Sequence, residues 1–247
     1  MKIRVGHLYP EYLNIYADRG NIAVLATRAR ARGHEFEVTA ISLGNPVPAG
    51  AIDLFYVGGG QDREQGLIAP DLAGKGAALR EAAGAGAAVL AVCGGYQLLG
   101  RHYRNRSGSE LPGIGLLPLY TVAGERRMIG DVLLDCPWAG ETLAGFENHA
   151  GRTVLDDGAE PLGRVIAGFG NDGVSGFEGC RVARAYGTYL HGPLLPRNPW
   201  LADRLLEDAL AHRTGEEVEL ERLPDELEHA AHAVSAARAR ARGGRSR

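Results

Sequence analysis

The chain has 247 residues, of which 45% are hydrophobic and 23% charged, so it is long enough to bury a full core within one domain. Its formal net charge of −3 shows no general basic excess, which argues against nucleic acid as the main partner. Cys93, Cys136 and Cys180 lie far apart without a CxxC pair, which argues against a disulfide framework or zinc knuckle and fits a reducing cytoplasm.

The first hundred residues alternate between strand and helix patterns. The N-terminus runs straight into a β-type segment without a signal peptide, and no apolar run approaches the roughly 18 residues of a membrane span, so we expect a cytoplasmic protein. Alternating strands and helices predict right-handed βαβ units, and the continuously apolar last run is typical of a strand buried in a parallel sheet. The expected elements are a strand at 3–8, a helix at 21–32, strands at 36–43 and 53–57, a helix at 71–85 and a strand at 87–92.

The pattern changes after Gly113. Short β-type runs at 129–134, 153–155 and 181–190 are separated by Gly, Asn and Asp turns, and helical periodicity returns only at 200–211. We interpret this half as a twisted, partly antiparallel extension of a mostly parallel central sheet.

The C-terminal segment differs in composition from the rest. It starts acidic at Glu216 and finishes with several arginines, including Arg245 and Arg247. We predict a charged helix that frays into a disordered, solvated basic tip rather than an RNA- or membrane-binding arm. The chain is therefore divided into a domain at 1–212 and a charged tail at 213–247.

The strongest chemical signal is Val92-Cys93-Gly94-Gly95-Tyr96-Gln97, where a buried strand ends in a cysteine and two glycines lead into a helix. This layout is typical of a nucleophile elbow, in which a sharp turn raises the side chain above the sheet edge. A thiol at a helix N-terminus is favoured as the thiolate, the attacking species. A buried structural cysteine is the alternative, and it suits Cys136 and Cys180 better because neither has flanking glycines.

A nucleophile needs a base and donors for an oxyanion. His191 ends a β-type run before a Gly-Pro turn and is the candidate base, although a histidine in such a place without other context is more often structural. The backbone N–H groups of Gly94 and of Gly59, in the Gly58-Gly59-Gly60 loop, are the candidate oxyanion donors. The loop lacks the Lys-Ser/Thr pair of a Walker motif, so nucleotide binding is disfavoured.

Together, the triple-glycine loop, the Cys93-x-Gly-x-Gln97 elbow and the distant His191 resemble class I glutamine amidotransferases over residues 1–212. The segments 92–100 and 189–193 are similar to the cobyric-acid-synthase-like branch of that class. Three further segments, 9–21, 59–65 and 146–153, are similar to the GatD-type subunits of lipid II isoglutaminyl synthases. The resemblance implies a three-layer α/β fold with a mostly parallel sheet and an antiparallel extension.

The same resemblance implies a reaction and a partner. Cys93 would form a thioester with glutamine and release ammonia, with His191 moving the protons. A Mur-ligase-like (MurT-type) subunit would use the ammonia to amidate the D-glutamate α-carboxyl of lipid II in peptidoglycan synthesis. The resemblance implies that the partner subunit binds ATP, magnesium and zinc. We expect no cofactor or metal in this chain.

Four residues match family positions around the glutamine pocket. By this resemblance, Gln97 would face the substrate, Asn148 and His149 would form a loop beside it, and Arg127 would bind the substrate carboxylate, for which its guanidinium fork is suited. Arg126 is the alternative to Arg127, and a solvated surface arginine is the alternative to both.

One position departs from the wider class. Pro193 stands where a glutamate usually follows the histidine by two residues to orient the imidazole. We expect another residue of this chain or, as the family implies, an aspartate of the ligase subunit to replace it. Three other functions stay open: an amidotransferase for another acceptor such as a cobyrinate-type carboxylate, a cysteine hydrolase of related topology, and a non-catalytic partner-binding module.

Overall fold

A mostly parallel sheet forms the base of the molecule, which we analysed as a computed structural model that describes residues 1–16, 19–48 and 50–243. Its strands are β1 (Lys2–Leu8), β2 (Glu35–Ile41), β3 (Leu54–Val57), β4 (Ala88–Val92), β11 (Cys180–Val182) and β12 (Ala185–Thr188). They follow the order β11-β12-β4-β3-β1-β2, and all neighbours are parallel except β11 and β12. We call this the main sheet. The parallel strands β3 and β4 are buried along their whole length.

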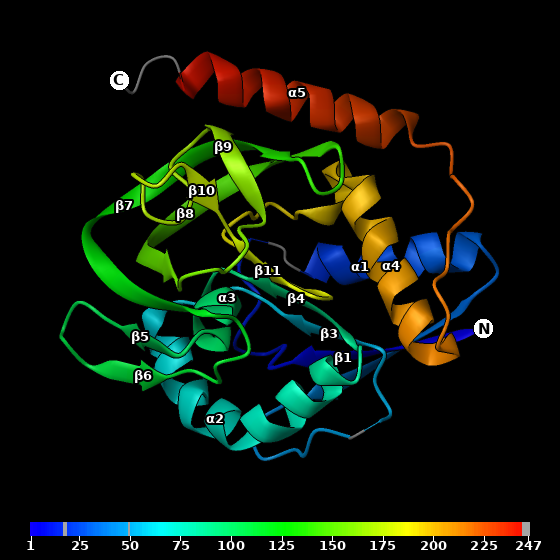
Figure 1. Ribbon diagram of the computed structural model, residues 1–247, viewed down its shortest axis with the longest axis horizontal. Coiled ribbons are helices and arrows are strands. Elements are labelled where there is room, and N and C mark those ends of the chain that lie inside the picture. The colour runs from blue at the N-terminus through cyan, green and yellow to red at the C-terminus, as the bar shows by residue number, and fades with distance from the viewer. Residues whose placement is uncertain (17–18, 49, 244–247) are drawn as a thin grey trace.

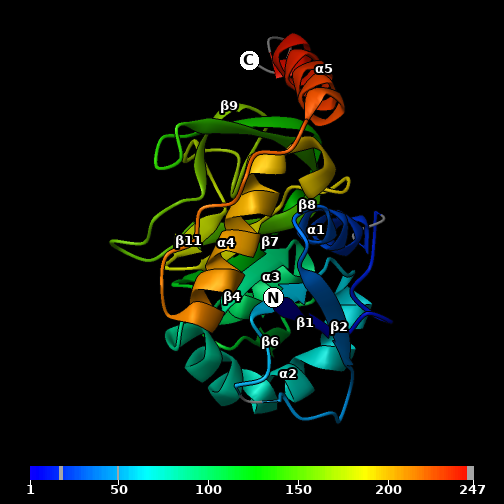
Figure 2. The ribbon, with the colours of Figure 1, turned by 90° about the vertical axis from the view of Figure 1, so that its right-hand side faces the viewer.

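Helices cover both faces of the main sheet. They are α1 (Arg19–Ala31), α2 (Asp62–Gly84), α3 (Gly94–Leu99) and α4 (Pro199–Thr214). From β1 the chain passes through α1 to β2 at one edge of the main sheet. From β3 it passes through α2 to β4, which lies in the opposite direction along the sheet. Because such crossovers are right-handed, α1 and α2 lie on opposite faces. Figure 2 shows α1 and α4 together on one side and α2 on the other. The predicted three-layer α/β fold is thereby confirmed.

Helix α2 is longer than the sequence indicates. It begins at Asp62 instead of near residue 71 and continues through Pro70, which normally ends or kinks a helix. Ile68, Ala69 and Leu72 are fully buried around this proline, so tertiary packing outweighs the local breaker signal. The extra turns are relevant to the site because they begin directly after the triple-glycine loop.

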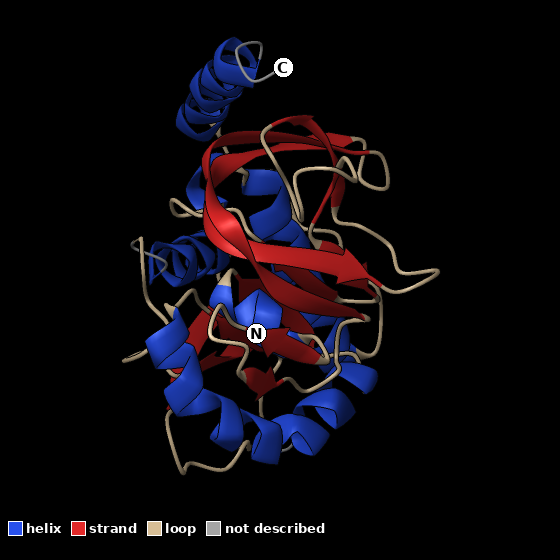
Figure 3. Cartoon of the chain, turned by 90° about the vertical axis from the view of Figure 1, so that its left-hand side faces the viewer, coloured by secondary structure: helices blue, strands red, loops and turns tan. Residues whose placement is uncertain are grey.

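A second sheet stands beside the main one. Its strands are β5 (His102–Arg104), β6 (Glu110–Pro112), β7 (Leu119–Cys136), β8 (Glu141–Leu155), β9 (Gly163–Ala167) and β10 (Phe177–Glu178). The sequence predicts only short runs here, but β7 and β8 form one long, curved antiparallel hairpin, visible in Figure 3. Its register shifts between Ala123 and Met128, so residues 124–127 form a bulge. Bulges break the alternation of side chains, which explains why no long periodic strand is readable there.

The last described helix packs on this second sheet. After the 3₁₀ turn η1 (Leu195–Arg197) and α4, the chain returns as α5 (Glu226–Gly243), which lies across β7, β8 and β9 in Figure 1. Ala236 and Ala239 on α5 are buried against alanine and leucine side chains of the sheet. The predicted charged helix is present, but it packs on the sheet through a face of small residues instead of being solvated on all sides. The basic tip with Arg245 and Arg247 lies outside the described residues.

In the described part of the chain, no helix is both long and apolar enough to cross a membrane.

Candidate active site

Cys93 lies on a strained turn between β4 and α3. Its backbone has φ 49° and ψ −104°, a region that residues other than glycine rarely adopt. The turn is held by the Cys93 N–H, which donates to the Thr188 carbonyl at 2.8 Å, and by the Gly95 N–H, which donates to Gly58 at 3.1 Å. A Cβ at Gly95 would lie 2.7 Å from the Val57 carbonyl oxygen. The two glycines after the cysteine are therefore required sterically, as expected for an elbow.

The elbow opens into a cavity of about 710 Å³ at the carboxyl edge of the main sheet. Segments after β1, β3 and β4 form its floor, and the β7–β8 hairpin with β5 forms its wall. The lining residues are Ile15, Tyr16, Gly60, Gln61, Asp62, Arg63, Gln65, Cys93, Gln97, Tyr103, Arg106, Arg127, Asn148, His149, Ala150 and Gly151. Cys93 is 6% exposed, so the cavity reaches the thiol and is large enough for an amino acid.

His191 lies on the strand next to the elbow. It follows β12 by three residues, and β12 pairs with β4 in parallel so that Thr188 is opposite Val92. Cys93 and His191 thus leave adjacent strands at the same sheet edge. Backbone hydrogen bonds with Phe146 hold the histidine, and its buried ring packs against the Tyr16 ring at 4.9 Å between centroids. His191 does not itself line the cavity, whereas Tyr16 does.

The triple-glycine loop packs directly on the elbow. The position of a Cβ on Gly94 would be 2.9 Å from the Gly60 nitrogen, so the two backbones are in contact. Gly60 lines the cavity, while the Gly59 carbonyl accepts a hydrogen bond from the Ile15 N–H at 3.3 Å. The backbone of the triple-glycine loop therefore lies against the backbone of the turn after Cys93, beside the cavity.

Arg127 and Asn148 meet across the hairpin at the cavity wall. The Arg127 Nε donates to the Asn148 Oδ1 at 2.7 Å and its Nη2 to the Asn148 carbonyl at 2.8 Å. Asn148 in turn donates to the Tyr16 hydroxyl. Arg127 belongs to the β7 bulge, which turns it toward the cavity, whereas Arg126 does not line the cavity. Of the two alternative arginines, the structure brings only Arg127 to the site.

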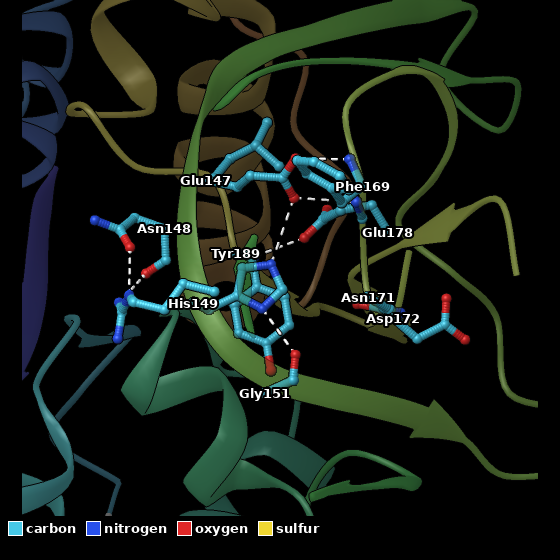
Figure 4. A network of polar contacts seen from close by, with 12 residues as sticks. Glu147, Asn148, His149, Gly151, Phe169, Asn171, Asp172, Glu178 and Tyr189 are labelled. Atoms are coloured by element: carbon cyan, nitrogen blue, oxygen red, sulfur yellow. Dashed lines mark hydrogen bonds and ion pairs between the residues drawn. The ribbon is translucent and has the colours of Figure 1, made fainter. Parts of the chain in front are cut away.

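His149 is fixed by a buried network behind the wall (Figure 4). Its Nδ1 donates to the Gly151 carbonyl at 2.9 Å, because a carbonyl can only accept, and its Nε2 lies 3.4 Å from the Glu147 carboxylate. The ring stacks on Tyr189 with 3.5 Å between centroids. Burial lowers the pKa of His149, and the contacts with Glu147 and the Gly151 carbonyl oppose this shift.

Two buried glutamates beside this network were not identified from the sequence. Glu147 accepts the backbone N–H groups of Phe169 and Gly170 at 2.6 and 3.0 Å. Glu178 accepts the Tyr189 N–H at 2.6 Å and the Thr188 hydroxyl, and its burial raises its pKa to about 8. Single glutamates in β-type runs carry no distinctive motif. The only available signal was that Glu147 directly precedes Asn148-His149.

Among the described residues, no group of three or more His, Cys, Asp or Glu side chains is arranged to hold a metal ion.

The elbow, the cavity and the layered sheet are features of glutamine amidotransferases, and comparison with known families agrees. Residues 4–199 match the CobB/CobQ-like glutamine amidotransferase domain, and the chain belongs to this family. Two curated relatives are similar over nearly the whole chain. The GatD subunit of lipid II isoglutaminyl synthase (glutamine-hydrolyzing) from Streptococcus pneumoniae is 39% identical across 92% of this chain and 87% of its own length, and that from Staphylococcus aureus is 39% identical across 92% of both.

More distant proteins share either the domain or the fold with this chain. The cobyric acid synthase of Pelotomaculum thermopropionicum is 39% identical, but over only 59% of this chain and 30% of its own length. Among solved structures, PurLQS from Thermotoga maritima superposes with a TM-score of 0.58 at 18% identity, covering 87% of this chain and all of that one. The glutaminase domain of the Trypanosoma brucei CTPS superposes at 0.55 with 9% identity, covering 89% and 96% of the two chains. At these identities the structures show the shared fold alone.

Proposed function

We propose that this chain is the glutaminase subunit of a lipid II isoglutaminyl synthase and supplies ammonia to a Mur-ligase-like partner of the MurT type. The observation that carries the proposal is Cys93 on its strained turn at the floor of the 710 Å³ cavity. The acceptor is inferred from the 39% identity to two GatD subunits along nearly the full length. The similarity to two cobyric acid synthases covers 59% and 77% of this chain and only 30% and 40% of their own lengths, which supports a cobyrinate-type acceptor less.

The chemistry follows from the placement of the elbow. The Cys93 thiolate attacks the carboxamide carbon of L-glutamine, and the resulting oxyanion accepts hydrogen bonds from the Gly94 and Gly59 N–H groups. His191 protonates the departing nitrogen, so ammonia leaves and a glutamyl thioester remains. His191 then takes a proton from water, which attacks the thioester and releases glutamate and the thiolate.

Residues of the cavity wall would orient the substrate. In this proposal Arg127 binds the α-carboxylate of glutamine, for which it exchanges part of its contact with Asn148. Gln97, Asn148 and His149 contact the remaining polar groups. The stacking of the His149 ring on Tyr189 holds this contact in a fixed orientation.

The partner has two roles in the proposal. It activates the D-glutamate α-carboxyl of lipid II with ATP and magnesium and carries the zinc, and it provides the carboxylate that orients His191. The second role is inferred because Pro193 occupies the position that bears a glutamate in the wider class. The complex would work in the cytoplasm. Without its partner, this subunit would hydrolyse glutamine only weakly.

The test is an assay of glutamate release and lipid II amidation by the chain with its Mur-ligase-like partner, ATP and glutamine. The proposal predicts amidation only when both subunits are present, and covalent labelling of Cys93 by diazo-oxo-norleucine. Equal glutaminase rates with and without the partner would contradict the shared triad. Amidation of a cobyrinate carboxylate but not of lipid II would replace the acceptor, and an unlabelled Cys93 would contradict the enzyme itself.

A further inference from the structure

Gln65 stands beside the cavity and has a buried side-chain oxygen without a partner among the described residues. The side chain is 2% exposed, stands in the first turn of α2 and lines the cavity with Cys93. Among the residues that the structure describes, none provides a hydrogen bond to the Gln65 Oε1. A buried acceptor of this kind costs free energy unless something binds it.

The orientation of this amide follows from its neighbours. The Gln65 Nε2 lies 3.2 Å from the Gly60 carbonyl, which can only accept, so the nitrogen must point there. The same nitrogen donates to the Gln97 Oε1 at 3.0 Å, which turns the Gln97 Nε2 toward the Tyr189 hydroxyl at 3.1 Å. With both contacts made by nitrogen, the free group of Gln65 is an acceptor.

Tyr189 continues the same directed chain. Since its oxygen accepts from Gln97, its proton is available to Thr153 at 2.6 Å, and Thr153 can then donate to Thr121 at 2.8 Å. Each side chain in this series thus donates a hydrogen bond to the next one. Turning the Gln65 amide over would place its oxygen against the Gly60 and Gln97 oxygens, so the network opposes the flipped state.

The amide of Gln65 also lies close to the nucleophile. A Cβ on Gly94, the residue after Cys93, would be 3.0 Å from the Gln65 Nε2. A ligand atom that reaches Gln65 is therefore near the reacting end of the substrate rather than its α-carbon end. The reacting end of glutamine has one hydrogen-bond donor, the carboxamide NH₂, whereas glutamate has only acceptors there at neutral pH.

We infer that Gln65 is a specificity residue whose Oε1 accepts a hydrogen bond from the carboxamide N–H of bound glutamine. The inference rests on the proposed glutaminase function. The contact selects an amide over a carboxylate or an ester and disfavours rebinding of the glutamate product. A purely structural role of Gln65, through its nitrogen on the Gly60 loop, would affect all substrates alike.

The experiment compares two substrates in the complete two-subunit complex. Glutamine and the γ-methyl ester of glutamate both acylate Cys93, but only glutamine has an N–H at the leaving group. For Gln65→Met, which keeps the side-chain volume, the ratio of kcat/KM for glutamine to that for the ester should fall about tenfold to hundredfold below wild type. The matched control is Leu67→Met, at an exposed position of the same helix that does not line the cavity, and its ratio should equal that of wild type.

The outcomes separate the two proposals. An unchanged ratio in Gln65→Met, with both rates lowered equally, would overturn the specificity role and leave the glutaminase intact. Loss of ester turnover without loss of glutamine turnover would also overturn it. If the wild-type complex hydrolyses neither substrate, the proposed function itself fails. If Gln65→Met misfolds, Gln65→Leu replaces it, and the same ratio of kcat/KM for glutamine to that for the ester is measured.

Discussion

The floor and the wall of the cavity are built by different means. The floor consists of the turns after β1, β3 and β4, where Cys93 and Gly60 stand within one or a few residues of the strands that hold them. The wall consists of the β7–β8 hairpin, where Arg127 and Asn148 meet only because two long strands pair in a register shifted by a bulge. The floor is thus determined by short-range sterics and the wall by long-range pairing. We expect changes in the floor to affect bond breaking and changes in the wall to affect substrate binding.

The comparison is tested most strongly at Cys93. Cys93→Ala removes the nucleophile, so glutamate release by the complex should fall by at least about a thousandfold. Glutamine binding, measured by calorimetry, should persist because the wall is unchanged. Cys180→Ala removes a buried thiol that does not line the cavity, and this variant should keep its activity. Similar losses in both variants would indicate a general effect on folding.

The second test concerns the glycines of the elbow. Gly95→Ala would place a Cβ 2.7 Å from the Val57 carbonyl, and this backbone contact cannot relax without moving Cys93. We expect kcat to fall about a hundredfold or more and the free energy of unfolding to fall by about 1–3 kcal/mol. Gly74→Ala, on α2 with open space around it, is the matched control and should stabilise the protein by roughly 0.5–1 kcal/mol. A fully active Gly95→Ala would show that the turn is not sterically restricted.

A change in the wall should have a different signature. Arg127→Ala removes the guanidinium that we assign to the substrate carboxylate, so KM for glutamine should rise about tenfold to fiftyfold with a smaller change in kcat. Arg126→Ala changes the neighbouring arginine, which does not line the cavity, and should keep KM near wild type. A larger effect of Arg126→Ala would reassign the substrate arginine.

The smallest effect on activity is expected at Glu178, which contacts Thr188 and Tyr189 behind the cavity and does not line it. Its pKa is raised to about 8 by burial, above the ordinary value near 4.5, so the folded protein holds a proton that the unfolded chain has lost between these pH values. The stability should therefore fall as pH rises from about 4.5 to about 8 and change little from this group above that range. In urea unfolding, wild type should lose about 2–4 kcal/mol more than Glu178→Gln over this range. If the free energy of unfolding changed with pH in the same way in wild type and in Glu178→Gln, a raised pKa of Glu178 would be contradicted.

The sequence by itself determined the layered fold and the elbow. A continuously apolar strand ending in Cys-Gly-Gly leaves few alternatives, because a sharp turn without room for side chains is encoded by adjacent residues. The placement of His191 at the same sheet edge as Cys93 follows from parallel pairing of β12 with β4. The catalytic roles of these residues, and the boundary at residue 212, stay predictions.

Only the tertiary structure decided the rest of the site. The start of α2 at Asp62 was hidden by Pro70, yet it is this first turn that carries Gln65 into the cavity. The choice of Arg127 over Arg126 depends on a bulge, and the packing of α5 depends on two small alanines meeting a sheet surface. Register and helix docking are set by contacts between residues far apart in the chain, and local patterns contain little information about such contacts.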